Sequence, residues 1–114
     1  MFLVLVLILD SILLIFGGDV DAQQTITEYQ LPMAAEAHEI LYFRKTSELL
    51  ITLRMPSTLV TVKLDKNKRI VGSKSYKLLS NDSFLHGLAL STIYRHHVWA
   101  TFETANQIAL INPK

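Results

Sequence analysis

The stretch "FLHGLALSTIYRHHVWATFETANQIALINPK", residues 84–114, decides the fold because residues 36–66, "EAHEILYFRKTSELLITLRMPSTLVTVKLDK", have a similar pattern. An offset of about 48 residues places His38 on His86 and keeps most apolar positions aligned. The further pairs, taken without a gap, are Ile40 with Leu88, Tyr42 with Leu90, Leu50 with Val98, Ile51 with Trp99, Thr58 with Asn106, Val60 with Ile108, and Val62 with Leu110. Tyr29 and Leu31 fall on Tyr76 and Leu78 once one extra residue is allowed in the loop before His86. The chain is therefore predicted to contain two units of one repeated structure.

Each unit is predicted to consist of short β-strands, since apolar and polar residues alternate or form short β-rich runs. The predicted strands are "EILYF" (39–43), "LLITL" (49–53), "TLVTVKL" (58–64), "RIVGSKSYKLL" (69–79), "GLALS" (87–91), "HVWAT" (97–101) and "QIALIN" (107–112). A competing interpretation makes "MAAEAHEILYF" (33–43) a helix, because Ala and Glu are good helix formers. It ranks second, because the matching "SNDSFLHGLAL" (80–90) contains Asn, Asp, Ser and Gly.

Four strands that recur every 40 to 50 residues or so are typical of the blades of a β-propeller. We therefore expect an all-β fold of two four-stranded antiparallel blades, at about residues 26–73 and 74–114, within a partial propeller of residues 23–114. The alternative is an eight-stranded sandwich with accidental self-similarity.

The N-terminus is a nearly unbroken apolar run, "MFLVLVLILDSILLIFGG", followed by "DVDAQQ" with small residues at Val20 and Ala22. This pattern predicts a secretory signal peptide at residues 1–22, and hence a secreted, extracellular protein. The alternative is an uncleaved membrane anchor, although residues 2–16 are short for a span of about 20 residues. Membrane association is expected only if this segment is retained.

Charge and cysteine content argue against nucleic-acid binding, a disulfide framework and a thiolate metal site. Removal of residues 1–22 takes away three acids and no base, which raises the formal net charge from +1 to +4. The bases are scattered apart from "KNKR" at residues 66–69, which is predicted to be a solvated turn, so no nucleic-acid partner is expected. The chain has no cysteine, and therefore neither a disulfide framework nor a thiolate metal site.

The strings "HGLALS" (86–91) and "HHVWATFETANQIALINP" (96–113) resemble the blade motif of streptogramin B lyase-like (virginiamycin B lyase-like) propellers. In that motif a His-Gly opens the inner strand, and "VWFTE", three residues and "NKI" follow. "EYQLP" (28–32) resembles the segment before such a His, and propellers of the NHL and gluconolactonase type share much of the pattern. The resemblance covers about two blades, and implies a fragment of a six- or seven-bladed ring or, as an alternative, several copies that assemble into one. Two blades alone would leave apolar faces open, so self-association is expected of the isolated chain.

His38 and His86 open the predicted inner strands, where propellers place ligands. Each is a ligand-binding candidate or a general base, since imidazole titrates near neutral pH. The alternative, which we favour, is that a recurring His ties one blade to the next by hydrogen bonds.

The resemblance associates a His of this motif and a Glu after "WFT" with catalysis and a magnesium ion. Here Phe102 follows "WAT", and the carboxylate comes one place later at Glu103, which on a strand faces the opposite side. The corresponding residue of the first unit is Arg54. His86 and Glu103 are thus the catalytic candidates; no cofactor or metal ligand is predicted from the residues themselves, and magnesium follows only from the resemblance.

The remaining candidates are weaker. His96 and His97 are expected in a solvated turn; a metal pair is the disfavoured alternative, because neighbours on a strand point apart. Trp99 is expected in the core, and the alternative is that it stacks on a sugar. "NDS" at residues 81–83 makes Asn81 a predicted N-glycosylation site. The acids Glu36, Glu39 and Asp82 show no pairing typical of glycosidases or calcium sites, and no phosphate loop or nucleophile elbow occurs.

Two functions remain open. The first is a non-catalytic propeller piece that binds a small molecule, glycan or protein. The second is part of a lyase-like or lactonase-like enzyme whose active site needs further blades.

Overall fold

A computed structural model of the chain describes residues 25–31 and 36–114. The predicted signal peptide at residues 1–22 lies outside the described residues. All the strands belong to one compact unit, Leu31–Lys114. The described residues contain strands and no helix, so the fold is all-β as predicted. In this part of the chain, accordingly, no helix is long and apolar enough to cross a membrane.

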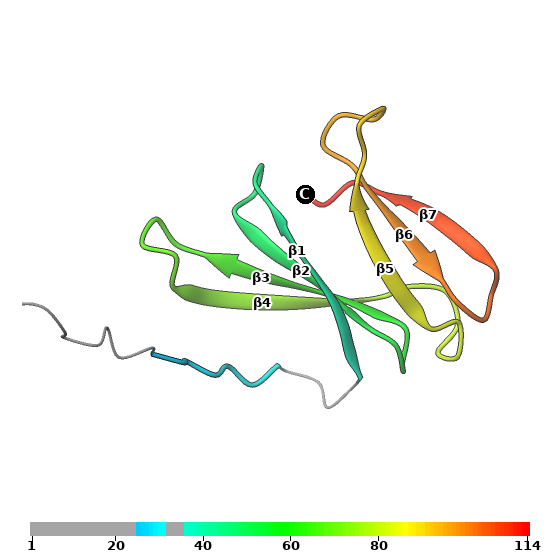
Figure 1. Ribbon diagram of the computed structural model, residues 1–114, viewed down its shortest axis with the longest axis horizontal. Helices are drawn as coiled ribbons and strands as arrows, with labels where there is room; N and C mark the ends of the chain where they lie inside the picture. The colour runs from blue at the N-terminus through cyan, green and yellow to red at the C-terminus, as the bar shows by residue number, and fades with distance from the viewer. Residues whose placement is uncertain (1–24, 32–35) are drawn as a thin grey trace, which may run out of the picture. The chain divides into compact units, whose positions relative to one another are not determined.

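The strands form two antiparallel sheets (Figure 1). The first sheet has the order β1-β2-β3-β4, with β1 at Ala37–Phe43, β2 at Glu48–Leu53, β3 at Thr58–Leu64 and β4 at Ile70–Lys77. The second has the order β5-β6-β7, with β5 at Leu85–Leu90, β6 at Val98–Phe102 and β7 at Gln107–Ile111.

The seven predicted strands are therefore confirmed, and the alternative helix is wrong over Ala37–Phe43. The expectation of four strands in the second sheet is wrong for this chain. A counterpart of β4 would follow Ile111, after which the sequence has only residues 112–114. β4 continues to Lys77, past the expected unit boundary at residue 73.

The turn between β3 and β4 is a solvated turn, as predicted for "KNKR". The Asp65 carboxylate accepts hydrogen bonds from the backbone N–H groups of Asn67 and Arg69, at 2.8 and 2.9 Å. These bonds lower the pKa of Asp65, chiefly through the Arg69 N–H. Lys68 adopts the left-handed conformation, with φ of 63°, that closes the turn.

A shared core joins the two sheets, because side chains alternate between the faces of a strand and each sheet turns one apolar face to the other. Its buried members from the first sheet are Phe43, Leu50 and Leu59, and those from β5 and β6 are Leu85, Val98, Ala100 and Phe102. The other face of the first sheet carries a second buried cluster, formed by Ile51, Leu53, Val60 and Val62, against which Leu31 packs.

Strand pairing shows how the two sheets correspond. In the first sheet Ala37 pairs with Leu53 and Ile40 with Ile51; in the second Leu85 pairs with Phe102 and Leu88 with Ala100. The first strands thus correspond at an offset of 48 residues, but the second and third strands at 49. The connection between equivalent paired residues is one residue longer in the second sheet, from Leu90 to Val98, than in the first, from Tyr42 to Leu49. The ungapped alignment is therefore wrong beyond the first strand of each unit. Arg54 corresponds to Glu103 and not to Phe102.

The corrected offset explains how the sheets stack. The core-facing residues Val98, Ala100 and Phe102 of β6 correspond to Leu49, Ile51 and Leu53 of β2, which lie on the face of the first sheet that points away from the second sheet. The two sheets consequently stack head to tail, with opposite faces in contact. The first sheet contacts the second through one face, and the corresponding face of the second sheet is uncovered. This open face carries Ala89, Trp99, Thr101, Ile108 and Leu110.

Candidate functional site

A β-bulge brings two consecutive side chains of β1 together. The pairing of β1 with β2 shifts between Ala37 and Ile40, so His38 and Glu39 both lie opposite Thr52. The backbone N–H of Glu39 donates to the Thr52 hydroxyl at 2.9 Å. Neighbours on a regular strand point to opposite faces, but a bulge re-aims one of them. His38 and Glu39 therefore reach the same site.

The second sheet has the same bulge at the corresponding place. The pairing of β5 with β6 shifts between Leu85 and Leu88, so His86 and Gly87 lie opposite Thr101. The Gly87 N–H donates to the Thr101 hydroxyl at 2.9 Å, as Glu39 does to Thr52. Each unit thus builds a His-containing bulge that is held by a threonine.

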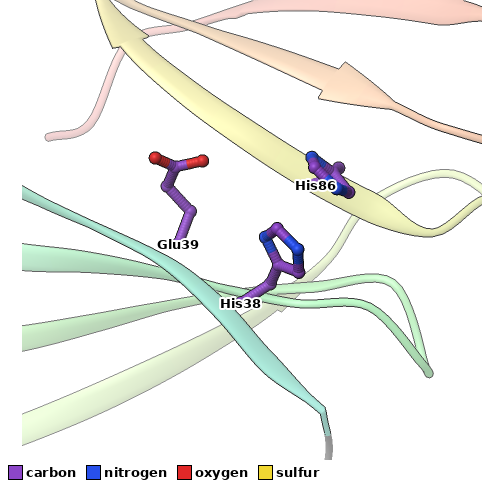
Figure 2. Close-up of side chains that lie close together, drawn as sticks. All are labelled: His38, Glu39 and His86. Atoms are coloured by element: carbon purple, nitrogen blue, oxygen red, sulfur yellow. The ribbon is translucent and has the colours of Figure 1, made fainter.

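The two bulges meet where β1 packs against β5. Figure 2 shows His38 and Glu39 on β1 and His86 on β5. One nitrogen of each imidazole and one oxygen of the carboxylate lie within 4.8 Å of one another. The ring centroids of His38 and His86 are 3.8 Å apart, with the planes tilted by 41°. The structure brings together the two histidines considered as ligand-binding candidates, and adds Glu39.

Sequence reasoning missed Glu39, because this acid shows no pairing with another acid that is typical of glycosidases or calcium sites. The signal available in the sequence was its place directly after His38, at the position matched by Gly87. A Cβ added at Gly87 would lie 3.8 Å from the nearer Glu39 carboxylate oxygen and only 3.0 Å from the Thr101 hydroxyl. Glycine at this position therefore leaves room beside the Glu39 carboxylate.

Thr52 joins the two halves of the cluster. Its side chain is fully buried; the hydroxyl accepts from the Glu39 N–H and donates to the backbone carbonyl of His86 at 2.8 Å. The expected tie between the units is present at this point, but it runs through the His86 main chain and the Thr52 side chain. The His86 imidazole is partly exposed and faces His38 instead.

Glu103, the carboxylate considered for catalysis, is held elsewhere. Its Oε2 accepts from Arg54 Nη2 at 3.0 Å, and its backbone N–H donates to the Phe84 carbonyl. The Arg54 guanidinium also lies 3.6 Å from Glu36 and 5.2 Å from the centroid of the Phe84 ring. The structure does not bring Glu103 into the group of His38, Glu39 and His86.

His96 and His97 lie in the β5–β6 turn, as predicted. His97 Nδ1 is 2.9 Å from the Arg95 carbonyl, and His96 adopts a left-handed φ of 64°. Partial desolvation, followed by the positive charges of Lys45, Arg95 and His97, lowers the pKa of His96.

Trp99 is half-buried on the open face of the second sheet, outside the core clusters, and packs edge-on against Tyr94 at 5.9 Å. The prediction that Trp99 packs in the core is therefore wrong for the described residues. Asn81 is exposed in its loop, while Ser83 of the same sequon is buried and donates to the Ser80 carbonyl.

Two imidazoles and one carboxylate form a donor set suited to zinc and similar transition-metal ions. Magnesium prefers oxygen ligands in a near-octahedral arrangement. The cluster of His38, Glu39 and His86 therefore does not fit the magnesium ion implied by the family resemblance.

Comparison of the chain with known protein families, with characterised proteins and with solved structures finds no match in any of the three. The resemblance of residues 86–113 to lyase-like propellers accordingly stays an expectation from the sequence.

Proposed function

We propose that the chain is part of a secreted β-propeller whose ring binds a small molecule, a glycan or a protein, without catalysis by these two units. The observation that carries this proposal is the head-to-tail stacking of two equivalent sheets. A contact between unlike faces can be repeated by a further sheet, and such a series closes into a ring when the rotation between successive sheets allows it. A sandwich of two sheets that bury their only apolar faces against each other would not need an apolar open face.

The open face of the second sheet supports continuation of the stack. Trp99 and Ile108 on this face correspond to Leu50 and Leu59, which are buried in the shared core. Thr101 corresponds to Thr52, whose hydroxyl reaches the carbonyl of His86 in the neighbouring sheet. A third sheet of the same kind would cover this face with equivalent contacts.

The bulged first strands support ligand binding. β1 and β5 lie side by side, and together they present two imidazoles and a carboxylate at a partly exposed site. Glu103 is engaged by Arg54, which supports binding rather than acid–base catalysis in this part of the ring.

The runner-up is a lyase-like or lactonase-like enzyme whose catalytic acid comes from another blade. The His86-Gly87 pair at the start of β5 favours it, because the family motif places a His-Gly there. In that case His86 serves as the base, and the present units supply half of the active site.

Purification of the secreted protein from its native source separates these possibilities. We expect a mature N-terminus at Gln23, an enzymatically removable glycan on Asn81, and a particle that electron microscopy shows as a closed ring. A compact monomer of residues 23–114 would contradict the propeller. Turnover of a streptogramin or a lactone by the same preparation, lost in His86→Ala with the fold intact, would select the enzyme instead.

A further inference from the structure

We propose that His38, Glu39 and His86 bind a divalent transition-metal ion of the zinc type at the junction of β1 and β5. This site goes beyond the proposed function, because it requires neither a closed ring nor a particular organic ligand. All three ligands come from described residues of one compact unit.

The spacing of the three side chains suits a metal site that tightens when it is loaded. The ligand atoms lie within 4.8 Å of one another, whereas ligands of a tetrahedral zinc ion, with bonds of about 2.0–2.1 Å, are roughly 3.3 Å apart. His38 is exposed and His86 is partly exposed. Small rotations of their side chains, without a change in the strands, therefore close the gap.

The main chain beneath the site is already fixed. The β1 bulge directs His38 and Glu39 to the same site, and the Thr52 hydroxyl joins the Glu39 N–H to the His86 carbonyl. Because Thr52 is fully buried, this link is shielded from water. Thr52 acts as a positioning residue and not as a ligand.

The donor set determines which ions bind. Two histidines and one carboxylate, with a fourth position open, favour Zn²⁺, Co²⁺ or Ni²⁺ over Mg²⁺ and Ca²⁺. The open position would accept water or an anionic group of a ligand. The ion would link the first sheet to the second, because its ligands come from both.

The test is titration of the full chain with ZnCl₂ in a calorimeter, with excess MgCl₂ present. We expect saturable binding of one ion per chain that magnesium does not displace. His38→Ala or His86→Ala should weaken zinc binding about 100-fold or more, since loss of a residue that merely orients a ligand costs about 10- to 100-fold. The double variant His96→Ala/His97→Ala, which removes two imidazoles outside the site, should bind as the wild type does.

Two further measurements keep the test decisive if a histidine variant fails to fold. Glu39→Gln preserves the shape of the side chain and should still weaken zinc binding at least tenfold or so. X-ray absorption of the zinc-loaded wild type should show two imidazole nitrogens and a carboxylate oxygen around the ion. Absence of saturable binding, fewer than two imidazole ligands, or equal loss in the His96/His97 control would overturn the proposal.

Discussion

Arg54 and Glu103 occupy corresponding positions in successive sheets and form an ion pair with each other, with Arg54 Nη2 at 3.0 Å from Glu103 Oε2. Each follows the second strand of its sheet, and each donates its backbone N–H to a residue just before the first strand, Glu36 or Phe84. The same place in the repeat thus carries opposite charges in the two units. The pair joins the two sheets at one end of their contact.

This ion pair should be worth little in free energy, because the Glu103 side chain is 50% exposed. A double-mutant cycle with Arg54→Met and Glu103→Gln should give a coupling of about 0.2 to 1 kcal/mol in the free energy of unfolding in urea. The coupling should fall as salt is added. The cycle of Arg54→Met with Glu36→Gln is the control, and should give less, since that pair is longer at 3.6 Å. A larger coupling for Glu36 than for Glu103 would contradict the geometry.

Thr52→Val should destabilise the chain by about 2 kcal/mol, because it leaves the Glu39 N–H and the His86 carbonyl without their buried partner. Thr52→Ser keeps the hydroxyl and should lose less, about the 0.8 kcal/mol of one buried carbon. Chemical denaturation monitored by circular dichroism measures both.

Thr101→Val is the matched control for Thr52→Val. The Thr101 hydroxyl also accepts a bulge N–H, but the residue is exposed and water can replace the lost bond. Its variant should stay within about 0.5 kcal/mol of the wild type. Equal losses of stability in Thr52→Val and Thr101→Val would show that the buried link between the sheets contributes no more than the exposed hydrogen bond of Thr101.

Gly87→Ala should lower stability by about 1 kcal/mol, because the added methyl would lie only 3.0 Å from the Thr101 hydroxyl that holds the bulge. Gly72→Ala is the control, since a Cβ there meets nothing within 4 Å. That variant should be neutral, or up to about 1 kcal/mol more stable through loss of chain entropy in the unfolded state. Melting curves of the two variants, run side by side, check the difference. If Gly87→Ala were as stable as Gly72→Ala, the close approach of the Gly87 backbone to the Thr101 hydroxyl would be refuted.

The strands could be predicted from the sequence because alternation is a local property. "TLVTVKL" and "QIALIN" show period two, and β3 and β7 lie where that pattern places them. The head-to-tail contact of the sheets was not predictable in detail, because it depends on an offset that changes from 48 to 49 in a loop. A slip of one residue moves a side chain to the other face, which is why Leu50 and Val98, aligned without a gap, lie on opposite faces of their sheets.

The candidate site could be predicted only in part. His38 and His86 stand out because they recur, but Glu39 reaches them through a bulge, and a bulge breaks the alternation on which the strand prediction rests. The Thr52 link joins residues 34 positions apart and has no local signal. The ion pair of Glu103 likewise has no local signal, because its partner Arg54 comes from the other sheet.

His96 should make stability depend on pH. Its pKa in the folded chain lies below the ordinary 6.5, first through desolvation and then through the nearby charges of Lys45, Arg95 and His97. Folding therefore disfavours the protonated form. The contribution of His96 to stability is present above pH 6.5 and is lost as the pH falls through the lowered pKa.

Titration of the His96 ring by NMR should show the lowered pKa, and Lys45→Gln should raise it toward 6.5. His96→Gln should remove part of the stability loss between neutral and mildly acidic pH. A pKa at or above 6.5 in the wild type would contradict the environment of this turn.

The last prediction concerns the open face of the second sheet: the chain from residue 23 should self-associate when it is expressed alone. Ile108 is 70% and Leu110 37% exposed on this face, beside the half-buried Trp99. Burial of each large apolar side chain contributes about 1.5 to 3 kcal/mol, and whole domains are stable by only about 5 to 15 kcal/mol. A few such residues therefore suffice to drive association.

Sedimentation velocity over a range of concentrations should show oligomers of the wild type, and the double variant Ile108→Lys/Leu110→Lys should shift the distribution to smaller species. Val71→Lys changes another exposed apolar residue, on β4 and away from the open face, and should leave the distribution unchanged. A monomeric wild type with a sharp two-state melt would contradict the open face as a contact surface. Equal effects of the Val71 and the Ile108/Leu110 variants would instead trace the association to general surface hydrophobicity, and the head-to-tail continuation of the stack would lose its support.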